Sequence, residues 1–384
     1  MDTELRKQAA ILGAFTADAA SLGYHWLYDS SRIHELAAGT PEFHTPNPDD
    51  YDGVSGYFAH GHKSSGDLTH YGVHLWTAID SLHAHSGKWN SFDYQARFCR
   101  TFDRGGSFSG YIDTATSGTL DNYFQSNKEL MDKSLLQVED VSVADLGYMR
   151  TFITKYGLIY QGKALIKAID TLFSSFTDDT AVVEKAKKVA KYYDKHRTLH
   201  TGADDNQIPA FSKVPAVVVA ELGESKLIPA VDDAVRITNN NDEAVTYAVY
   251  AARVLEKVLL GTRINDALRT SLSESPDYNG LHHNIERALE SETLKPAQLA
   301  ETFGATCSVP SAIPLSVAIM NQCPDYTEAI RINIMAGGDS AGRAIFLGSI
   351  LGAAEGIGGN HGIPLNWISK LTELDAICEA VDLL

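Results

Sequence analysis

The sequence predicts an all-α protein, and three observations support this fold class. From Glu4 to Tyr28 the apolar residues recur at spacings of three and four, as they do along an amphipathic helix. The alanine-rich stretch from Ala244 to Leu259 repeats apolar residues one helical turn apart, which fits an interior helix. No convincing alternation of apolar and polar residues, the sign of a half-buried strand, occurs in the sequence. We expect residues 1–384 to form one all-α domain of ten or more helices.

Composition restricts the possible functions. The chain has 384 residues, 44% hydrophobic and 21% charged, with a formal net charge of −17. This surplus of acids argues against non-specific binding to nucleic acid or anionic lipid, so we expect no nucleic acid and no membrane partner. The four cysteines form no zinc-like cluster. Without a signal-peptide pattern or a run of 18 apolar residues, we expect a soluble cytoplasmic protein.

A carboxylate lies in the middle of the first predicted helix. Asp18 is surrounded by small residues in the segment Gly13–Gly23. A buried charge without a partner is costly, so this carboxylate must be hydrogen-bonded if it is buried. Asp18 is therefore expected either to anchor a polar network or to be part of a site.

Residues 29–64 are predicted to form a long loop, because prolines, acids and glycines follow one another there without periodicity. Long loops in compact domains are often functional. The loop leads into a helix with Leu75, Ile79 and Leu82 on its inner face, which places Asp67 at a second helix start.

The histidine-richest region spans the end of this loop and the helix after it. His70 and His74 lie one helical turn apart, but no Glu follows the first of them, as a zinc-binding H-E-x-x-H pattern requires. We interpret these histidines as lining a polar cleft, where they could hydrogen-bond a substrate or titrate near neutral pH. The candidates for substrate contact in this region are His62, Lys63 and His70.

Two further polar segments are candidates to line a site. Gly105–Thr119 is rich in glycine and hydroxyl groups and too irregular for a known phosphate-binding loop, so we expect a loop there. Gly202–Pro215 places two acids and two amides before an apolar helix, although solvated turn chemistry would give the same pattern. The candidate residues from these segments are Tyr111, Asp113, Asp205 and Asn206.

Helices are also expected over residues 148–176 and 179–193. Between them, Thr177-Asp-Asp-Thr180 could suggest a chemically active site. Such residues before an apolar run favour a helix N-cap instead.

The stretch from Met335 to Ile357 is the most distinctive in the chain. A Gly-Gly-Asp turn leads into an apolar segment with glycines at 348, 352 and 356, one per turn, so neighbours can approach that helix closely. Asp339 and Ser340 are expected to begin the helix. They could cap it, or the Asp could hold a cation or a reacting group.

These motifs resemble the ADP-ribosylglycohydrolase family, including its J-crystallin branch. Gly13–Gly23 is similar to the family's first-helix motif, and Ser65–Thr69 to its Thr-Asp-Asp-Thr metal motif. Gly337–Gly356, followed by Gly362-Ile-Pro-Leu-Asn-Trp367, is similar to its Gly-Gly-Asp-Thr-Asp-Thr helix and Ile-Pro-x-x-Trp ending. The resemblance implies an all-α fold with a central cleft. It also implies two magnesium ions that position an ADP-ribose-like substrate and a water for glycosidic cleavage.

The resemblance also implies a reduced metal site. Carried over by position, the remaining ligands are Ser65, Asp67, Asp339 and Ser340. Gly66, Ala341 and Gly342 stand where further ligands are expected. Two magnesium ions need several hard oxygen ligands, so we expect one weak ion or none. Arg343, with its permanent positive charge, could replace a missing cation by facing Asp339 or Asp67.

Three hypotheses about function follow. The first is a hydrolase acting on an ADP-ribosyl or related small glycosidic substrate, with Asp67 as general base. In it, Asp339 and Arg343 fix the electrostatics, and Asp18 and Asp205 support them. The second is a non-catalytic, crystallin-like or binding protein on the same fold. The third is an enzyme with changed chemistry that uses the His and Asp residues of 60–74.

Overall fold

The computed structural model describes residues 1–291 and 293–383. Helices α1 (Thr3–Ser21) and α18 (Ser340–Glu355) pack against each other through the centre of the body. Every residue of α18 up to Ala353 is buried, and so is α1 from Ala9 onward. A helix that is apolar on all sides is an interior helix, so this pair forms the middle of the core. No sheet is present among the described residues, and the all-α prediction is confirmed.

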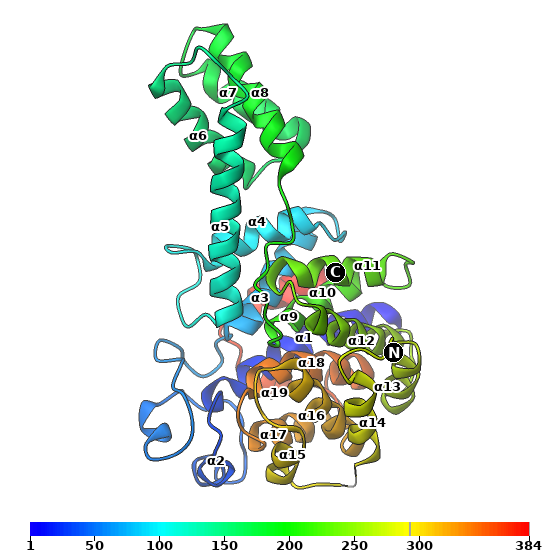
Figure 1. The fold of residues 1–384 in the computed structure, drawn as a ribbon. Coiled ribbons are helices and arrows are strands. Elements are labelled where there is room, and N and C mark those ends of the chain that lie inside the picture. Colours follow the sequence, from blue (N-terminus) through cyan, green and yellow to red (C-terminus); the bar gives the residue numbers. More distant parts are fainter. Residues whose placement is uncertain (292, 384) are drawn as a thin grey trace.

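The other helices surround this pair or extend from it (Figure 1). In chain order they are η1 (Leu22–Tyr24), α2 (Ser30–Ala37), η2 (Pro48–Tyr51), α3 (His70–Ala84), α4 (Ser91–Phe102), α5 (Thr114–Leu135), α6 (Val143–Gly157), α7 (Gly162–Ser174), α8 (Thr180–His196), α9 (Pro209–Ser212), α10 (Val214–Ala220), α11 (Leu227–Thr238), α12 (Asp242–Leu259), α13 (Ile264–Ser273), α14 (Leu281–Glu290), α15 (Pro296–Phe303), α16 (Val309–Gln322), α17 (Tyr326–Met335), α19 (Leu365–Ile368) and α20 (Leu374–Asp382).

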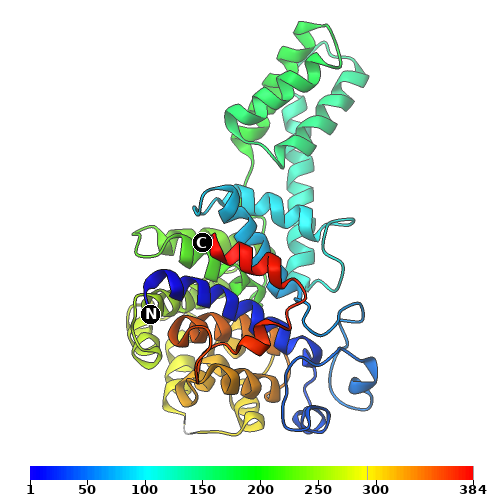
Figure 2. The same cartoon turned by 180° about the vertical axis from the view of Figure 1, so that it is seen from behind.

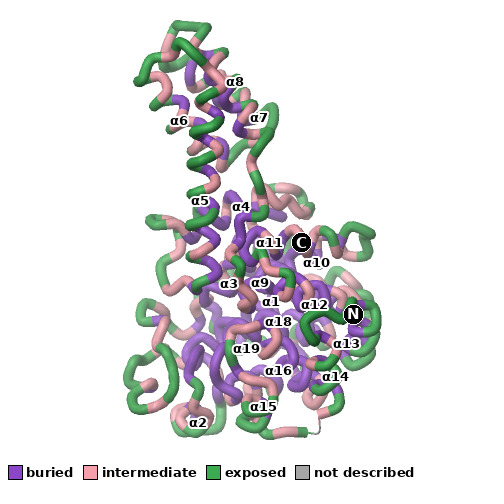
Figure 3. The backbone as a smooth tube through the Cα atoms, viewed as in Figure 1, coloured by how far each residue is buried: buried purple, intermediate pink, exposed green. Residues whose placement is uncertain are grey.

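Helices α6, α7, α8 and the outer half of α5 form an arm that projects from the body (Figure 1). The arm has its own hydrophobic cluster, which includes Met149, Ile153, Ile169 and Phe173 and is separate from the core of the body. Figure 3 shows the same division: the interior of the body is continuously buried, whereas burial in the arm is confined to its inward face.

Several predicted boundaries differ from the structure. The expected loop 29–64 contains helix α2, capped by Asp29, whose side chain accepts a hydrogen bond from the amide of Arg32. The expected loop 105–119 ends early, because Asp113 caps α5 and the helix begins at Thr114. Both helices start at an Asp within segments rich in Pro, Gly or hydroxyl residues, where the apolar periodicity is weak. The single helix expected over 148–176 is divided into α6 and α7.

Other local predictions are confirmed. Asp179 caps α8 and accepts a hydrogen bond from the amide of Ala181, so Thr177–Thr180 is a capping sequence. Asp339 caps α18, as its position after the Gly-Gly turn indicated. No helix within the described residues combines the length and apolar character needed to cross a bilayer.

Candidate functional site

Buried carboxylates meet where four helices come together: the last turn of α1, and the starts of α3, α5 and α18. Asp18 comes from α1, Asp113 caps α5 and Asp339 caps α18, and none of the three is more than 1% exposed. Helix starts present unpaired amides and favour negative charge, which explains why two of these acids are stable there. Residues far apart in the sequence thereby form one polar centre inside an apolar body.

Asp18 is bonded to a single residue. Its Oδ1 accepts a hydrogen bond from the hydroxyl of Thr69 at 2.5 Å, and its Oδ2 accepts one from the amide of Thr69 at 2.8 Å. Burial raises the pKa of Asp18 to about 6, and the Thr69 bonds oppose this shift only in part. Gly72 lies one turn along α3, where a Cβ atom would overlap Asp18 Oδ2. Asp18 is therefore an anchor between α1 and α3.

Asp339 is held by three donors. Its Oδ1 accepts hydrogen bonds from the Gly342 amide at 2.9 Å and from His25 Nε2 at 3.0 Å, and its Oδ2 accepts one from the hydroxyl of Tyr71 at 2.7 Å. Burial favours the neutral acid, but the His25 and Tyr71 bonds and the positive charge of Arg343 outweigh it, so the pKa of Asp339 is below its ordinary value. This carboxylate is ionised at neutral pH.

Two histidines continue the chain of hydrogen bonds from Asp339. His25 Nδ1 lies 2.6 Å from His60 Nε2. Because His25 Nε2 must donate to the carboxylate, its Nδ1 accepts, and His60 Nε2 carries the donated proton. Burial lowers the pKa of His25 and lowers that of His60 to about 2. Both rings are therefore neutral near pH 7, and neither is a strong base.

Asp113, like Asp339, is surrounded by hydrogen-bond donors and histidines. Its Oδ1 accepts a hydrogen bond from the amide of Thr116 at 2.7 Å, its Oδ2 accepts one from the Thr116 hydroxyl at 2.9 Å, and His70 Nε2 lies 3.1 Å from Oδ2. His74 Nε2 is 3.0 Å from the same hydroxyl. Although burial raises it, the pKa of Asp113 is held below its ordinary value by His70, His74 and the Thr116 amide. Burial lowers the pKa of His74 to about 3.

Aromatic rings cover this centre. The ring of Trp26 lies 4.3 Å from that of His25, and Tyr111 meets Trp26 edge-on at 4.9 Å and His70 at 5.8 Å. Tyr57 completes the cluster and is 57% exposed. Trp26 has a φ of +62°, which is rare for a bulky residue, and its amide donates to the Gly338 carbonyl at 2.7 Å. The space beside Asp339 is thus filled by rings.

Asp205 is the half-buried acid of this region. Its Oδ1 accepts a hydrogen bond from the amide of Gln207 at 2.7 Å, and its Oδ2 accepts one from the hydroxyl of Thr114 at 3.3 Å. Burial raises the pKa of Asp205, and the negative charge of Asp113 raises it further. Asp113 and Asp205 are therefore neighbouring acids whose pKa values move in opposite directions.

The segment Ser65–Asp67 differs from its predicted role. The N-cap of α3 is Thr69, not Asp67, and Asp67 Oδ2 accepts a hydrogen bond from the Ser64 amide at 2.8 Å. Ser65 donates its hydroxyl to the Phe43 carbonyl at 2.6 Å, and Gly66, at a φ of +93°, packs on the Lys370 carbonyl. Within the described residues, no hydrogen bond joins Asp67 to Asp339.

Arg343 does not pair directly with either acid in the described structure. The fully buried guanidinium donates to Asn333 Oδ1 at 2.7 Å and to the carbonyls of Gly337 at 2.6 Å, Asn333 at 3.2 Å and Ala305 at 3.3 Å. Burial lowers the pKa of Arg343 to about 10, so it remains charged. Its charge acts on Asp339 from a distance, while its hydrogen bonds hold the Gly337 turn.

The other predicted contact residues lie around the centre rather than in it. His62 is exposed, Lys63 Nζ is 4.9 Å from the centroid of the Phe108 ring, and Asn206 donates to Glu243 at 2.6 Å. The Ser340 hydroxyl is buried without a hydrogen-bond partner among the described residues.

The donor set does not fit magnesium. No group of three or more His, Cys, Asp or Glu side chains suited to a metal is found among the described residues. Both oxygens of Asp339 and of Asp18 already accept hydrogen bonds from the protein, and the Ser65 hydroxyl is bonded to a carbonyl. A hard cation needs several free oxygen ligands, which these residues do not offer.

Sequence reasoning missed the residues that bind Asp339. His25 lies at the end of the first helical segment, and Tyr71 has the periodicity of a core residue; only the structure shows both rings turned to one carboxylate. The segment Ala-Ser-Leu-Gly-Tyr-His-Trp carries a signal for His25, because it places a His beside a Trp directly after small residues at the end of a buried helix. His60 and His74 belong to the histidine-rich region expected to line a cleft, but the sequence does not single them out as site residues.

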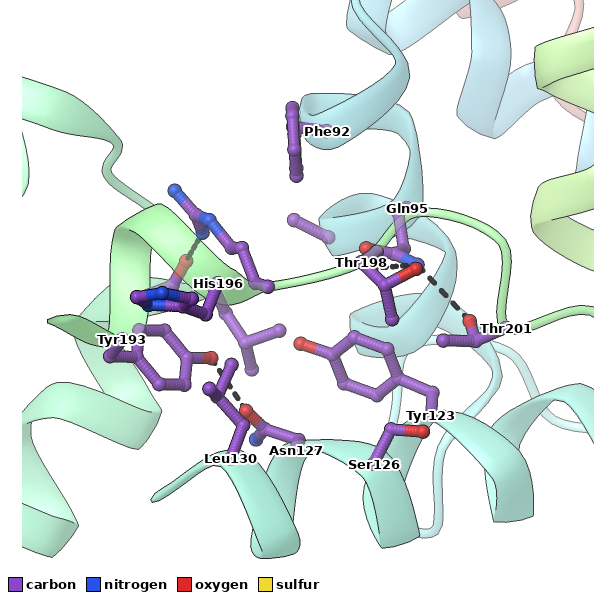
Figure 4. A pocket seen from close by; sticks show the side chains of 14 residues that line it. Phe92, Gln95, Tyr123, Ser126, Asn127, Leu130, Tyr193, His196, Thr198 and Thr201 are labelled. Atoms are coloured by element: carbon purple, nitrogen blue, oxygen red, sulfur yellow. Dashed lines mark hydrogen bonds between the residues drawn. The ribbon is translucent and has the colours of Figure 1, made fainter. Parts of the chain in front are cut away.

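A separate cavity lies between the arm and the body, lined by residues of α4, α5, α8 and the connection after α8 (Figure 4). Its volume is about 60 Å³. Tyr193 donates to Asn127 Oδ1 at 2.6 Å across one wall, and Gln95 donates to Thr201 at 3.1 Å across another. It shares no lining residue with the Asp339 centre.

Comparison with known proteins identifies the family. The ADP-ribosylglycohydrolase family model matches residues 1–384. The chain belongs to the ADP-ribosylglycohydrolase family. Crystallin J1A of Tripedalia cystophora is 23% identical over 376 residues, which are 97% of this chain and 94% of the crystallin. Crystallin J1B of the same species is 26% identical over 170 residues, 44% of this chain and 52% of that protein.

A solved structure supports the ADP-ribosylglycohydrolase fold. An ADP-ribosylglycohydrolase-related protein complex is similar to this chain with a TM-score of 0.61 and 14% identity, covering 100% of this chain and 98% of that one. The resemblance to the family inferred from the Gly337–Gly356 motif is confirmed by the family model. At this identity, the likeness concerns the fold alone.

Proposed function

We propose that this protein is a glycosidase-like hydrolase of the ADP-ribosylglycohydrolase family that acts without bound magnesium. Its substrate is a small molecule with an ADP-ribosyl or related glycosidic bond. The observation that carries the proposal is the pair Asp113 and Asp205, whose pKa values move in opposite directions. Two carboxyl groups with separated pKa values are the arrangement that glycosidic cleavage uses when no metal takes part.

Each acid of the pair has a distinct task in this proposal. Asp205, half-buried and with a raised pKa, donates a proton to the oxygen or nitrogen of the leaving group. Asp113 stays ionised and stabilises the positive charge that develops on the sugar carbon, because its site is shielded from water. A water molecule then adds to the sugar carbon and gives a proton to the Asp205 carboxylate, which completes the hydrolysis. Thr114, which donates to Asp205, follows Asp113 at the start of α5, so both acids are positioned by one helix start.

The aromatic cluster supports a ring-containing substrate. Tyr57 and Tyr111 lie between His70 and solvent, where their rings can pack against a sugar or a base. In this proposal, Asp339, the neutral His25 bonded to it and the neutral His60 bonded to His25 are positioning groups beneath the rings. A single weak magnesium ion at Ser65, Asp67, Asp339 and Ser340 is the other form of the hypothesis, and the hydrogen bonds that Ser65 and both oxygens of Asp339 already make argue against it.

The test is turnover of ADP-ribosylated small molecules, measured as release of ADP-ribose. The assay is carried out once with magnesium and once with a chelator. We expect equal rates in both conditions. Asp205→Asn should lower kcat at least about 100-fold, since a general acid contributes factors of this order. Asp121→Asn on α5 is the control, because this exposed carboxylate has no hydrogen bond or ion pair within the described residues.

Two results would redirect the assignment. If Asp67→Asn abolishes turnover while Asp205→Asn does not, the chemistry belongs to the Asp67 loop. If chelation abolishes turnover, the metal-free mechanism is wrong.

A second candidate is a non-catalytic, crystallin-like protein, and two observations favour it. Asp18 and Asp339 have all their oxygens bonded within the protein, and a crystallin is similar over 97% of the chain. For this candidate we expect no turnover and no heat on titration with ADP-ribose, although the protein is folded.

A further inference from the structure

The arm carries a groove between α7 and α8 with a volume of about 480 Å³. Lysines line both of its sides, and on each helix they recur every four residues, so each set lies on one face. Ile166 and the methylene stems of the lysines give the groove an apolar floor. This lysine groove consists of Gly162, Lys163, Ile166, Lys167, Asp170, Lys187, Lys191, Asp194 and Lys195.

The two acids of the lysine groove are already engaged. Asp170 Oδ1 lies 3.0 Å from Lys187 Nζ. Asp194 is paired with Arg197 and accepts a hydrogen bond from the Gly162 amide at 2.9 Å. They therefore leave most of the positive charge unbalanced.

Four lysines of the groove remain without a carboxylate partner among the described residues: Lys163, Lys167, Lys191 and Lys195. All four are exposed. The first turn of α7 also lacks an acidic residue, so the positive end of the helix adds to their field. An uncompensated basic groove on a chain with a net charge of −17 indicates an acidic partner.

Helix α20 has a complementary surface. Asp375, Glu379 and Asp382 are exposed and spaced by four and three residues, so they form one acidic face, while Ile377 and Val381 are buried. None of these carboxylates forms an ion pair within the described part of the chain. The last turn of α20 has no basic residue, so the negative end of the helix is also unrelieved.

We propose that the lysine groove of one copy binds the acidic face of α20 on a second copy. The carboxylates on α20 and the lysines on α8 both repeat about once per helical turn, roughly 6 Å apart, so several ion pairs can form together. Within one chain the two surfaces are separated, because the arm projects away from the body on which α20 packs (Figure 2). Used reciprocally about a two-fold axis, the contact closes a dimer.

The groove chemistry favours a protein segment over a nucleic acid. None of its lining residues is aromatic, so it offers no ring on which bases could stack. The net charge of the whole chain also repels a long polyanion, whereas the contact with α20 is local.

The test is sedimentation equilibrium of the full chain at about 20 mM and about 500 mM salt, since high salt screens exposed ion pairs. We expect a dimer at low salt that dissociates at high salt. Lys191→Glu with Lys195→Glu should weaken the dimer at least about tenfold, and Asp375→Lys with Glu379→Lys should do the same. The control pair Lys128→Glu with Lys133→Glu, on the exposed surface of α5, should leave it unchanged.

The decisive measurement is a mixture of the two charge-reversed proteins. In the heterodimer the charge-reversed groove faces the charge-reversed α20, and the two unchanged surfaces face each other. Both contacts are then complementary, so mixing should restore the association that neither protein shows alone. Restored association also excludes misfolding as the cause of the loss. A wild-type chain that stays monomeric at about 100 µM in low salt, or a mixture that does not associate, overturns the proposal.

Discussion

Asp18 and Asp339 are buried to the same extent, yet the pKa of Asp18 is raised and that of Asp339 is lowered. Asp18 has one partner residue, Thr69, and burial dominates, so its pKa rises to about 6. Asp339 has three donors and the nearby charge of Arg343, so its pKa falls. The number of donors that point at a carboxylate, rather than its depth, decides the direction in which its pKa moves.

We predict a distinct pH dependence for Asp18→Asn. The folded state binds the Asp18 proton more tightly than the unfolded chain, whose ordinary value is 3.8. Wild-type stability from this group is therefore fully present below about pH 4 and is lost as pH rises to about 6, on the order of 3 kcal/mol. Asn does not titrate, so the free energy of unfolding of the variant increases relative to that of the wild type as pH rises across that range.

The measurement is chemical denaturation of both proteins between pH 4 and pH 7. Asp204→Asn, at an exposed position, should follow the wild type throughout. A constant difference between Asp18→Asn and the wild type over this range would contradict the raised pKa.

At the scale of elements, the position of the site depends on how closely α1 and α18 approach. A Cβ atom on Gly13 would overlap the Gly348 carbonyl, and a Cβ atom on Gly348 would overlap the Gly13 carbonyl. Gly352 is similarly placed against the carbonyl of Ala9. Because the backbones touch, Asp18 on α1 and Asp339 at the start of α18 are brought to one polar centre. The predicted small-residue face is confirmed for Gly348 and Gly352, whereas Gly356 is the C-cap.

We predict that Gly348→Ala destabilises the protein by about 1–3 kcal/mol or more, because the added methyl group forces the two helices apart. The matched control is Gly147→Ala in α6, where a Cβ atom meets nothing within 4 Å. That change should stabilise its helix by roughly 0.5–1 kcal/mol, the usual gain of Ala over Gly. Denaturant midpoints compare the two, and equal effects would refute the packing argument.

At the scale of the whole molecule, the chain has a body and an arm with separate hydrophobic clusters. The arm is joined to the body by the continuous helix α5 and by the connection after α8 (Figure 1). The two clusters share no residue, so their opening free energies can differ. Whether residues 1–384 behave as one domain depends on how strongly the body and the arm are coupled, so the single domain stays a prediction.

We predict that amide hydrogen exchange is faster in α6 and α7 than in α1 and α18, since the smaller cluster buries less apolar surface. Leu165→Ala removes a fully buried side chain of the arm. It should reduce protection in α6–α8 by about 2–5 kcal/mol and leave α1 and α18 unchanged. Leu351→Ala, in the body, is the matching control: it should reduce protection in α1 and α18 and leave α6–α8 unchanged. Equal loss of protection in both parts after Leu165→Ala would show that they unfold as one unit.

The sequence alone determined the all-α class, the family and many helix ends, because periodicity, caps and glycine spacing are local properties. It singled out Asp18, Asp113, Asp205 and Asp339 as candidate site residues, and Asp18 as an acid that needs a partner if it is buried, since a buried charge without a partner is costly.

Only the tertiary structure decided which partners these acids have. His25 and Tyr71 are 46 residues apart in the numbering, and neither carries a local signal, yet both donate to Asp339. The expected role of Asp67 differed for the same reason, because its helix start, two residues further on, is capped by Thr69. A hydrogen bond depends on direction and distance between atoms of different helices, and these are fixed only when α1, α3 and α18 pack together.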